Sequence, residues 1–286
     1  MNGSSRSIAI KKNIIASLFL KGISILVSLQ VVPLTINYIN PTRYGIWLTL
    51  SSIVAWLSYF DLGFAHGFRN RFAEAVAKGD MQLAREYVST TYVVLSLLFS
   101  SVFLIAIVVN HFVDWSAILN VDAAYSSELN IVFGILAFFF CLNIVASIFT
   151  TMLTANQKPA LASLIQTLGQ VFGFICIYIL TKTVPGNLDV LAFAFSGVPC
   201  FLLIIISIGM FLSGRYRHLS PSFHFVHFSL TKKIVGLGGQ FFIIMISMLF
   251  VFQLINIVIS RVAGPMAVTQ YNLSLIHISE PTRLQL

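Results

Sequence analysis

Residues 190–214 read VLAFAFSGVPCFLLIIISIGMFLSG and contain no charged side chain over 25 consecutive positions. A helix needs about 20 apolar residues to cross the hydrocarbon core of a bilayer, so this stretch is long enough for one membrane span. Four more blocks of 23 to 29 residues also lack charge: 87–113, 129–157, 159–181 and 234–260. The chain is therefore predicted to be an all-α, polytopic transmembrane helical bundle.

The composition of the whole chain agrees with a membrane protein. Of its 286 residues, 58% are hydrophobic and only 9% are charged, which lies far outside the range of soluble domains. Soluble enzymes, secreted disulfide scaffolds and nucleic-acid-binding proteins are thereby excluded, although the net charge is +8. The three cysteines, Cys141, Cys176 and Cys200, all lie in apolar blocks without a CxxC pair. We interpret them as core residues and expect no metal and no cofactor.

Seven spans are predicted, at residues 13–39, 45–66, 88–113, 130–154, 161–181, 190–213 and 235–260. Lys and Arg concentrate on the cytoplasmic side of membrane proteins, so the loops report the orientation. With the N-terminus inside, 12 of the 17 basic residues fall in inside segments, and the three in outside segments are Arg43, Lys182 and Arg261. We therefore expect a multi-pass protein of the bacterial inner membrane with a cytoplasmic N-terminus, and no nucleic-acid partner.

The predicted connection at residues 69–86 has the pattern of an amphipathic helix. Its apolar face carries Phe72, Ala75, Val76 and Leu83. Glu74 and Lys78 form an i,i+4 pair of opposite charge on another face. We expect a helix that lies at the membrane interface and is interrupted near Gly79-Asp80.

A second connection, at residues 215–233, is rich in aromatic side chains. It contains Pro221, three Phe residues and the pair His224/His227. Aromatic residues lying at the level of the lipid headgroups are the favoured interpretation. A partial metal site at the two histidines is the alternative, but no carboxylate or Cys accompanies them in the sequence.

A weak internal repeat organises the chain. Residues 11–45 resemble residues 232–272: both begin with paired lysines, run through a long apolar segment and reach a Pro followed by a Tyr. Parallel repeats are an established plan of transporters. Residues 273–283, LSLIHISEPTR, resemble the translation of a sequencing-library adapter. We expect a six-helix lobe at 1–213, an inter-lobe connection at 214–234, the first helix of a truncated second lobe at 235–272, and a non-native tail at 273–286.

Two charged residues fall inside predicted spans, where a charge is costly and marks a candidate site. Lys21 lies about eight residues into the first span, and Asp61 lies near the end of the second. These two residues either form an ion pair with each other or line a polar cavity. Arg69, Asn70 and Arg71 follow at the mouth of the membrane, where the planar arginine side chain suits phosphate recognition.

The first ninety residues resemble a known family of transporters. Tyr44-Gly45, Asp61-Leu62-Gly63 and Gly67-Phe68-Arg69-Asn70 are similar to the signature of Wzx-type polysaccharide flippases, in the multidrug/oligosaccharidyl-lipid/polysaccharide (MOP) exporter superfamily. The resemblance implies two six-helix lobes around a central cavity, of which this chain holds the first lobe and the first helix of the second.

The same resemblance implies a transporter rather than an enzyme. Its substrate would be a polyprenyl-diphosphate-linked oligosaccharide, a repeat unit for polysaccharide or O-antigen synthesis. Lys21, Arg69, Asn70 and Arg71 are the expected substrate-binding residues, and Asp61 holds Lys21 or takes part in coupling to Na⁺ or H⁺. The expected partners are membrane lipid and other polysaccharide assembly proteins.

Two alternatives stay open from the sequence. A drug/cation antiporter of the same superfamily would need an acidic cavity, whereas Lys21 is basic. A membrane-embedded glycolipid polymerase or acyltransferase would need catalytic residues on an outer loop, and the longest predicted outer segment offers His111, Asp114, Asp122 and Glu128. No P-loop is present, which argues against ATP hydrolysis.

Overall fold

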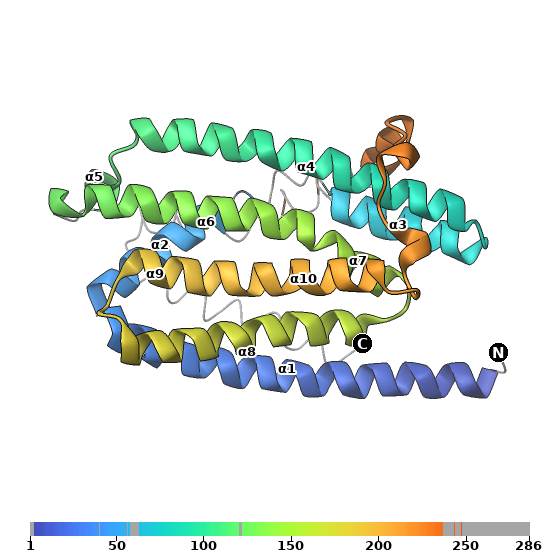
Figure 1. Cartoon of the computed structure of the whole chain (residues 1–286), viewed down its shortest axis with the longest axis horizontal. Coiled ribbons are helices and arrows are strands. Elements are labelled where there is room, and N and C mark those ends of the chain that lie inside the picture. Colours follow the sequence, from blue (N-terminus) through green and yellow to red (C-terminus); the bar gives the residue numbers. More distant parts are fainter. Residues whose placement is uncertain are drawn as a thin grey trace. The chain divides into compact units, whose positions relative to one another are not determined.

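The computed structural model describes residues 3–39, 41–55, 57, 63–119, 122–236, 243 and 247 of the chain. Within these residues the secondary structure is helical and contains no strand (Figure 1). The predicted all-α membrane bundle is confirmed, because five helical segments among the described residues are long and apolar enough to cross a membrane.

Five of the seven predicted spans appear as helical segments of membrane-crossing length. The first is α1 (Gly3–Ile39), and the third is α4 (Met81–Phe112). The fourth consists of η2 (Ala123–Tyr125), α6 (Ser126–Ala146) and α7 (Ile148–Ala155). The fifth is α8 (Pro159–Thr183), and the sixth consists of α9 (Leu188–Ala192), η3 (Phe193–Gly197) and α10 (Val198–Leu212). Nearly all of the seventh lies outside the described residues.

For the second predicted span, residues 45–66, the predicted C-terminal boundary is wrong. Helix α2 (Pro41–Ala55) is followed by a separate helix, α3 (Phe64–Ala77), and residues 56 and 58–62 lie outside the described residues. Gly63 precedes α3 with φ at 76°, a left-handed backbone conformation that glycine adopts readily. A single helix running to His66 is therefore excluded by the turn at Gly63.

Helix α3 and the turn after it confirm part of the prediction for residues 69–86. Gly79 has φ at 77° and Asp80 caps α4, where the Leu83 amide donates to its carboxylate at 2.9 Å. The Glu74–Lys78 pair forms, with 2.7 Å between Lys78 Nζ and Glu74 Oε1. The expected location of α3 at the membrane interface stays a prediction, but its apolar face packs against protein. That face is buried by packing on α4 and α7, and Phe72 is fully covered.

Helices α1 and α8 run parallel and in contact along their length (Figure 1). The Asn13 side-chain amide donates to the Gln157 carbonyl, the Ser24 hydroxyl to the Gln170 side chain, and the Tyr38 hydroxyl to the Pro185 carbonyl. The sequence separations of these pairs, 144, 146 and 147, are nearly constant, which requires a parallel arrangement. Helix α10 packs on another side of α8, and α4 packs on α6.

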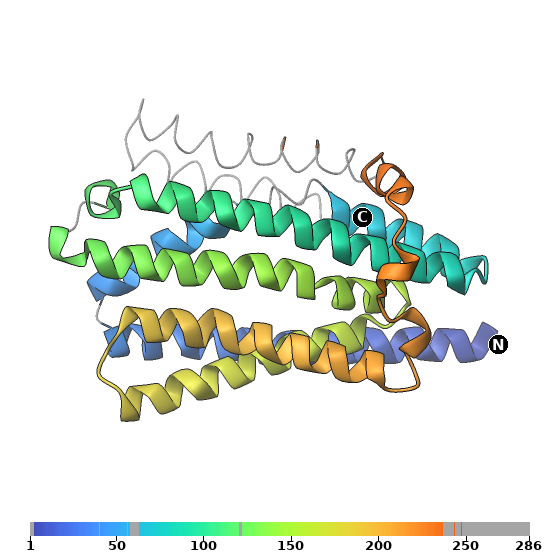
Figure 2. The same cartoon turned by 45° about the horizontal axis from the view of Figure 1, so that its top comes forward.

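The two ends of the bundle have separate hydrophobic cores. We call the end that carries α3 the α3 end, and the end that carries α5 (Trp115–Leu119) the α5 end (Figure 2). The large buried side chains toward the α3 end include Phe68, Phe72, Phe149, Phe211 and Tyr216. Those toward the α5 end include Trp47, Trp115, Leu129, Ile177 and Leu188. By contrast, α1 exposes many large apolar side chains, as expected for a helix that meets lipid or another protein surface.

Residues 1–238 form one compact unit, and residues 239–286 form a second. The predicted connection at 214–234 packs as part of the first unit, because Tyr216, Leu219, Leu230 and Ile234 are all buried. The predicted tail at 273–286 and nearly all of the predicted helix at 235–272 lie outside the described residues, so both stay predictions.

Gly67 lies where α3 meets the helical residues 229–236. A Cβ atom placed on Gly67 would lie 2.1 Å from the carbonyl oxygen of Ile234, which is backbone and cannot rotate away. We predict that Gly67→Ala lowers the free energy of unfolding by about 1 to 3 kcal/mol, the usual cost of overpacking. The measurement is the melting temperature of the detergent-solubilised protein.

The matched control for that substitution is Gly209→Ala in α10. A Cβ atom on Gly209 would meet no heavy atom within 4 Å, and alanine favours helices over glycine. The control should therefore melt at the wild-type temperature or slightly above it. Equal melting temperatures for Gly67→Ala and the wild type would contradict the close packing described here.

Candidate functional site

A polar cavity of about 330 Å³ opens between α3, α7 and α8. Its wall is made by Ala65, His66, Arg69, Thr150, Thr151, Thr154, Pro159, Ala162, Ser163 and Gln166. We call this space the α3–α8 cavity. It lies at the ends of three separate helices, so its composition is set by tertiary packing rather than by any single segment.

The electrostatic character of the α3–α8 cavity is positive. Arg69 lines it with an exposed guanidinium group that presents five N–H donors. Pro159 begins α8, whose N-terminus carries a partial positive charge and favours anions. Among the described residues that form the wall, none is acidic. The site is therefore suited to an anionic group such as a phosphate.

The rest of the wall offers neutral hydrogen-bonding groups. Thr150 and Thr151 both donate to the Ser147 carbonyl, at 2.8 and 3.0 Å, and Thr154 donates to the Thr150 carbonyl at 2.9 Å. These bonds use the hydroxyl hydrogens and leave oxygen lone pairs to accept from a ligand. Ser163 and Gln166, on the facing helix α8, add a hydroxyl and an amide. Such a wall suits the hydroxyl groups of a sugar.

A local break in the helix positions the threonines. Helix α6 ends at Ala146 and α7 begins at Ile148, with Ser147 at a turn between them. The Ser147 hydroxyl donates back to the Ile144 carbonyl at 2.7 Å. Hydroxyl groups bonded to helix carbonyls commonly bend helices. The Ser147 carbonyl at this break accepts the hydroxyl hydrogen bonds of Thr150 and Thr151, two residues of the cavity wall.

The predicted residues Arg69, Asn70 and Arg71 are not brought together at this cavity. Arg69 lines it, whereas Asn70 and Arg71 are absent from the described wall. Arg71 Nη1 lies 3.0 Å from Glu74 Oε2, and Arg71 Nε donates to the Lys233 carbonyl at 3.4 Å. Hydrogen bonds from Lys78 and then from Arg71 hold the pKa of Glu74 below its usual value. The charge of Arg71 is thus balanced locally.

Lys21 is exposed on α1, one helical turn before Ser24. The parallel register of α1 and α8 puts Lys21 at the level of Gln166, a residue of the cavity wall. Within the described part of the chain, Lys21 makes no hydrogen bond or ion pair. Asp61 lies outside the described residues, so the predicted Lys21–Asp61 pair stays a prediction.

Most of the cavity wall was not predicted from the sequence, because charge in or beside the spans was taken as the mark of a candidate site. Thr150, Thr151 and Thr154 carry no charge, and neither do Ser163 and Gln166. One sequence pattern does indicate these wall residues: hydroxyl and amide side chains are concentrated on both sides of residues 156–158, where two apolar segments meet. Only the packing of α7 on α8 shows that these groups share one space.

A second cavity, of about 340 Å³, lies farther along α8 and is mostly apolar. Its aromatic wall includes Tyr44, Trp47, Phe174 and Phe195. Gln170 lines this second cavity, one helical turn beyond Gln166 in the first. A polar and an aromatic cavity therefore follow one another along α8.

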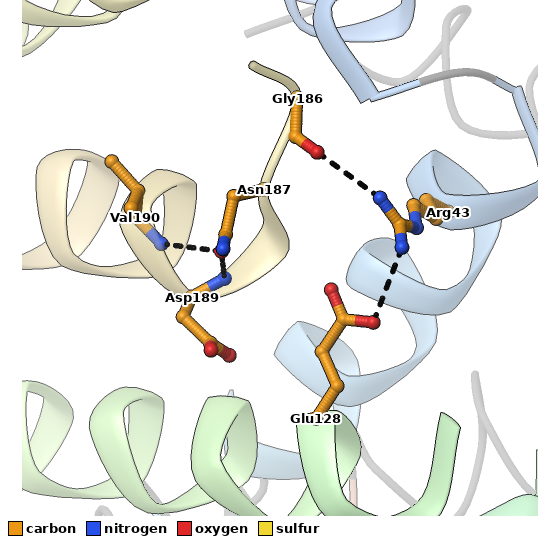
Figure 3. A network of polar contacts seen from close by, with 6 residues as sticks. All are labelled: Arg43, Glu128, Gly186, Asn187, Asp189 and Val190. Carbon is orange, nitrogen blue, oxygen red and sulfur yellow. Dashed lines mark hydrogen bonds and ion pairs between the residues drawn. The ribbon is translucent and has the colours of Figure 1, made fainter. Parts of the chain in front are cut away.

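The α5 end is tied together by Arg43, which Figure 3 shows between two partners. Its guanidinium donates to the Gly186 carbonyl at 3.1 Å and lies 3.4 Å from the Glu128 carboxylate. Asn187 caps α9, accepting from the Asp189 amide at 2.7 Å. Arg43 thereby joins α2 to α6 and to the segment between α8 and α9.

The histidine pair of the 214–234 connection does not form a metal site in the described part of the chain. The fold supplies a carboxylate that the sequence did not reveal, because His227 Nε2 lies 3.8 Å from Glu86 Oε1 of α4. Nevertheless, no group of three or more His, Cys, Asp or Glu residues is arranged to hold a metal ion among the described residues.

Comparison with known proteins gives a family. The family model described as polysaccharide biosynthesis protein matches residues 10–274, which is most of the chain. No curated protein and no solved structure matches the sequence. The matched region includes every residue of the α3–α8 cavity and all five helical segments of membrane-crossing length. The chain therefore belongs to the polysaccharide biosynthesis protein family, as a multi-pass membrane protein.

Proposed function

We propose that this protein is a flippase of the Wzx type, and not an enzyme. It would move a polyprenyl-diphosphate-linked oligosaccharide from the cytoplasmic to the periplasmic leaflet of a bacterial inner membrane. The family membership and the membrane-crossing helices support a transporter in polysaccharide synthesis. The observation that carries the proposal is the α3–α8 cavity, in which Arg69 and the N-terminus of α8 lie beside a wall of hydroxyl groups.

The two parts of this wall fit the two polar parts of such a substrate. The diphosphate would bind at Arg69, because an arginine can form two parallel charge-assisted hydrogen bonds to phosphate oxygens. The sugars would meet Thr151, Thr154 and Gln166, which offer acceptors and donors. Lys21 of α1 lies level with Gln166 of α8, and it would add a second positive charge as the substrate moves.

Transport would use alternating access. Arg43 ties the α5 end to both Glu128 and Gly186, while the α3–α8 cavity is open. The basic residues around α3 favour the α3 end as cytoplasmic, so the substrate would enter there. Asp61 would hold Lys21 or bind the coupling Na⁺ or H⁺.

The two alternative functions have less support. An exporter of cationic drugs needs acidic groups in its binding site, and the described wall of the α3–α8 cavity has none. For a polymerase or acyltransferase, the outer carboxylates would need to be available for catalysis. Asp114 instead accepts from the Ser116 and Ala117 amides, and Asp122 accepts from the Ala124 amide. Glu128 is paired with Arg43.

We predict that Arg69→Gln weakens the binding of polyprenyl diphosphate to the purified protein roughly ten- to a hundredfold. A charge-assisted contact contributes about 1.5 to 3 kcal/mol, which corresponds to that range. Arg69→Lys should retain part of the affinity, since a point charge replaces the planar group. The measurement is equilibrium binding in detergent, together with transport in proteoliposomes.

The matched control is Arg215→Gln, which removes an exposed arginine that lies outside the described cavity wall. It should bind as the wild type does. Loss of affinity to the same extent in Arg215→Gln and Arg69→Gln would show a nonspecific effect of net charge and contradict the assignment of Arg69.

A further prediction separates the two roles of Lys21. If Lys21 meets the diphosphate, Lys21→Gln should weaken diphosphate binding while the amount of protein in the membrane stays unchanged. An isolated buried carboxylate is costly, so a structural pair with Asp61 would instead lower the abundance of Lys21→Gln. Restoration of both abundance and binding by adding Asp61→Asn would eliminate the direct role of Lys21.

A further inference from the structure

A groove of about 460 Å³ lies between α4 and the connection after α10. On α4 it is lined by Ser89, Tyr92, Val93, Ser96 and Leu97, and on the connection by Pro221, Ser222 and Phe223. We call it the α4 groove. Its lining is mostly apolar, and no residue of its wall belongs to the α3–α8 cavity. The proposed transport function does not use this groove.

The connection is bonded to α4, which gives the groove a defined wall. The Ser222 amide donates to the Ser89 hydroxyl at 3.1 Å, and the His227 amide donates to the Thr90 hydroxyl at 3.0 Å. Arg85 Nε donates to the Ser220 carbonyl at 2.9 Å. The guanidinium of Arg85 also lies 4.2 Å from the ring centre of Phe225. Backbone groups of the connection are thus fixed on both sides of Phe223.

The α4 groove continues the exposed apolar side of α4. Leu97 lines the groove and is 60% exposed. Leu104 and Val108 follow it at seven and eleven positions, which places all three on the same side of the helix, and they are similarly exposed. Because α4 has the length and composition of a membrane span, this side suits contact with lipid chains. An acyl chain lying along this side reaches the groove past the small side chains of Ser100 and Ser101, and the Ser101 hydroxyl is bonded to the Leu97 carbonyl.

The connection above the groove is aromatic and basic. Phe223 is 87% exposed and Phe228 is 62% exposed, so both present large apolar surfaces. Residues 214–236 contain Arg215, Arg217, Lys232 and Lys233 but no Asp or Glu. Glu86 of α4 contacts the connection, with its Oε1 3.8 Å from His227 Nε2. Basic segments with exposed aromatic residues are attracted to anionic lipid headgroups.

We propose that the α4 groove binds one acyl chain of an anionic phospholipid, whose headgroup lies against the basic connection. The apolar lining accounts for the acyl chain, and the charge of the connection accounts for the preference for an anionic headgroup. The ligand is a resident lipid of the surrounding leaflet and differs from the transported glycolipid. This inference rests on insertion in a membrane and not on the proposed flippase activity.

The test is native mass spectrometry of the detergent-solubilised chain titrated with phosphatidylglycerol or with phosphatidylcholine of the same chain length. Phosphatidylglycerol should bind about tenfold more tightly. Ser96→Phe fills the groove and should abolish this binding. Its matched control is Ser127→Phe, at an exposed position of α6 outside the groove, which should bind as the wild type does.

A second variant tests the headgroup contact. Arg217→Gln removes an exposed charge four residues before Pro221 and should lower the preference for phosphatidylglycerol several-fold, with no change for phosphatidylcholine. Equal binding of the two lipids by the wild type, or equal binding by Ser96→Phe and Ser127→Phe, would overturn the proposal. Displacement of phosphatidylglycerol by polyprenyl diphosphate would assign the groove to the transported lipid and also overturn it.

Discussion

The packing of α7 and of α1 on α8 determines where the polar groups of the bundle meet. Because backbone groups in lipid must be satisfied inside helices, side chains and helix ends are left to define a site within the membrane. The contacts Asn13–Gln157, Ser24–Gln170 and Tyr38–Pro185 fix the register of the two helices. This register places Lys21 level with Gln166, and α8 then carries the walls of both the polar and the aromatic cavity.

The two ends of the bundle are built for different tasks. At the α5 end, Arg43 pairs with Glu128 and donates to the Gly186 carbonyl, so charge there joins α2 to α6 and to the segment before α9. At the α3 end, Arg69 faces an open space with no acidic partner among the described wall residues. Two glycines allow this placement of Arg69. Gly63 adopts the left-handed turn before α3, and Gly67 allows α3 to pack closely on Ile234. The proposed transport direction uses this difference between the ends.

Most of the fold followed from the sequence, and less of the candidate site did. Long apolar segments predict spans because length and apolarity are local properties, and five of the seven predicted spans appear among the described residues as helical segments of membrane-crossing length. The end of the second span was wrong because the turn at Gly63 lies within an apolar pattern. Arg69 was predicted from its charge, but the threonines of α7 and the pairing of Arg71 with Glu74 depend on tertiary contacts. The role of Asp61 stays a prediction.

The proposed flippase activity depends on recognition of a diphosphate-linked glycolipid by the α3–α8 cavity. Its most direct test compares the binding of polyprenyl-diphosphate and polyprenyl-monophosphate forms of one oligosaccharide to the purified protein. Chemical protection of a cysteine placed at Thr154, in the cavity wall, would report where each binds. We expect the diphosphate form to bind more tightly than the monophosphate form, with protection at residue 154. Equal affinity for the two forms, or binding that leaves residue 154 fully reactive, would contradict it.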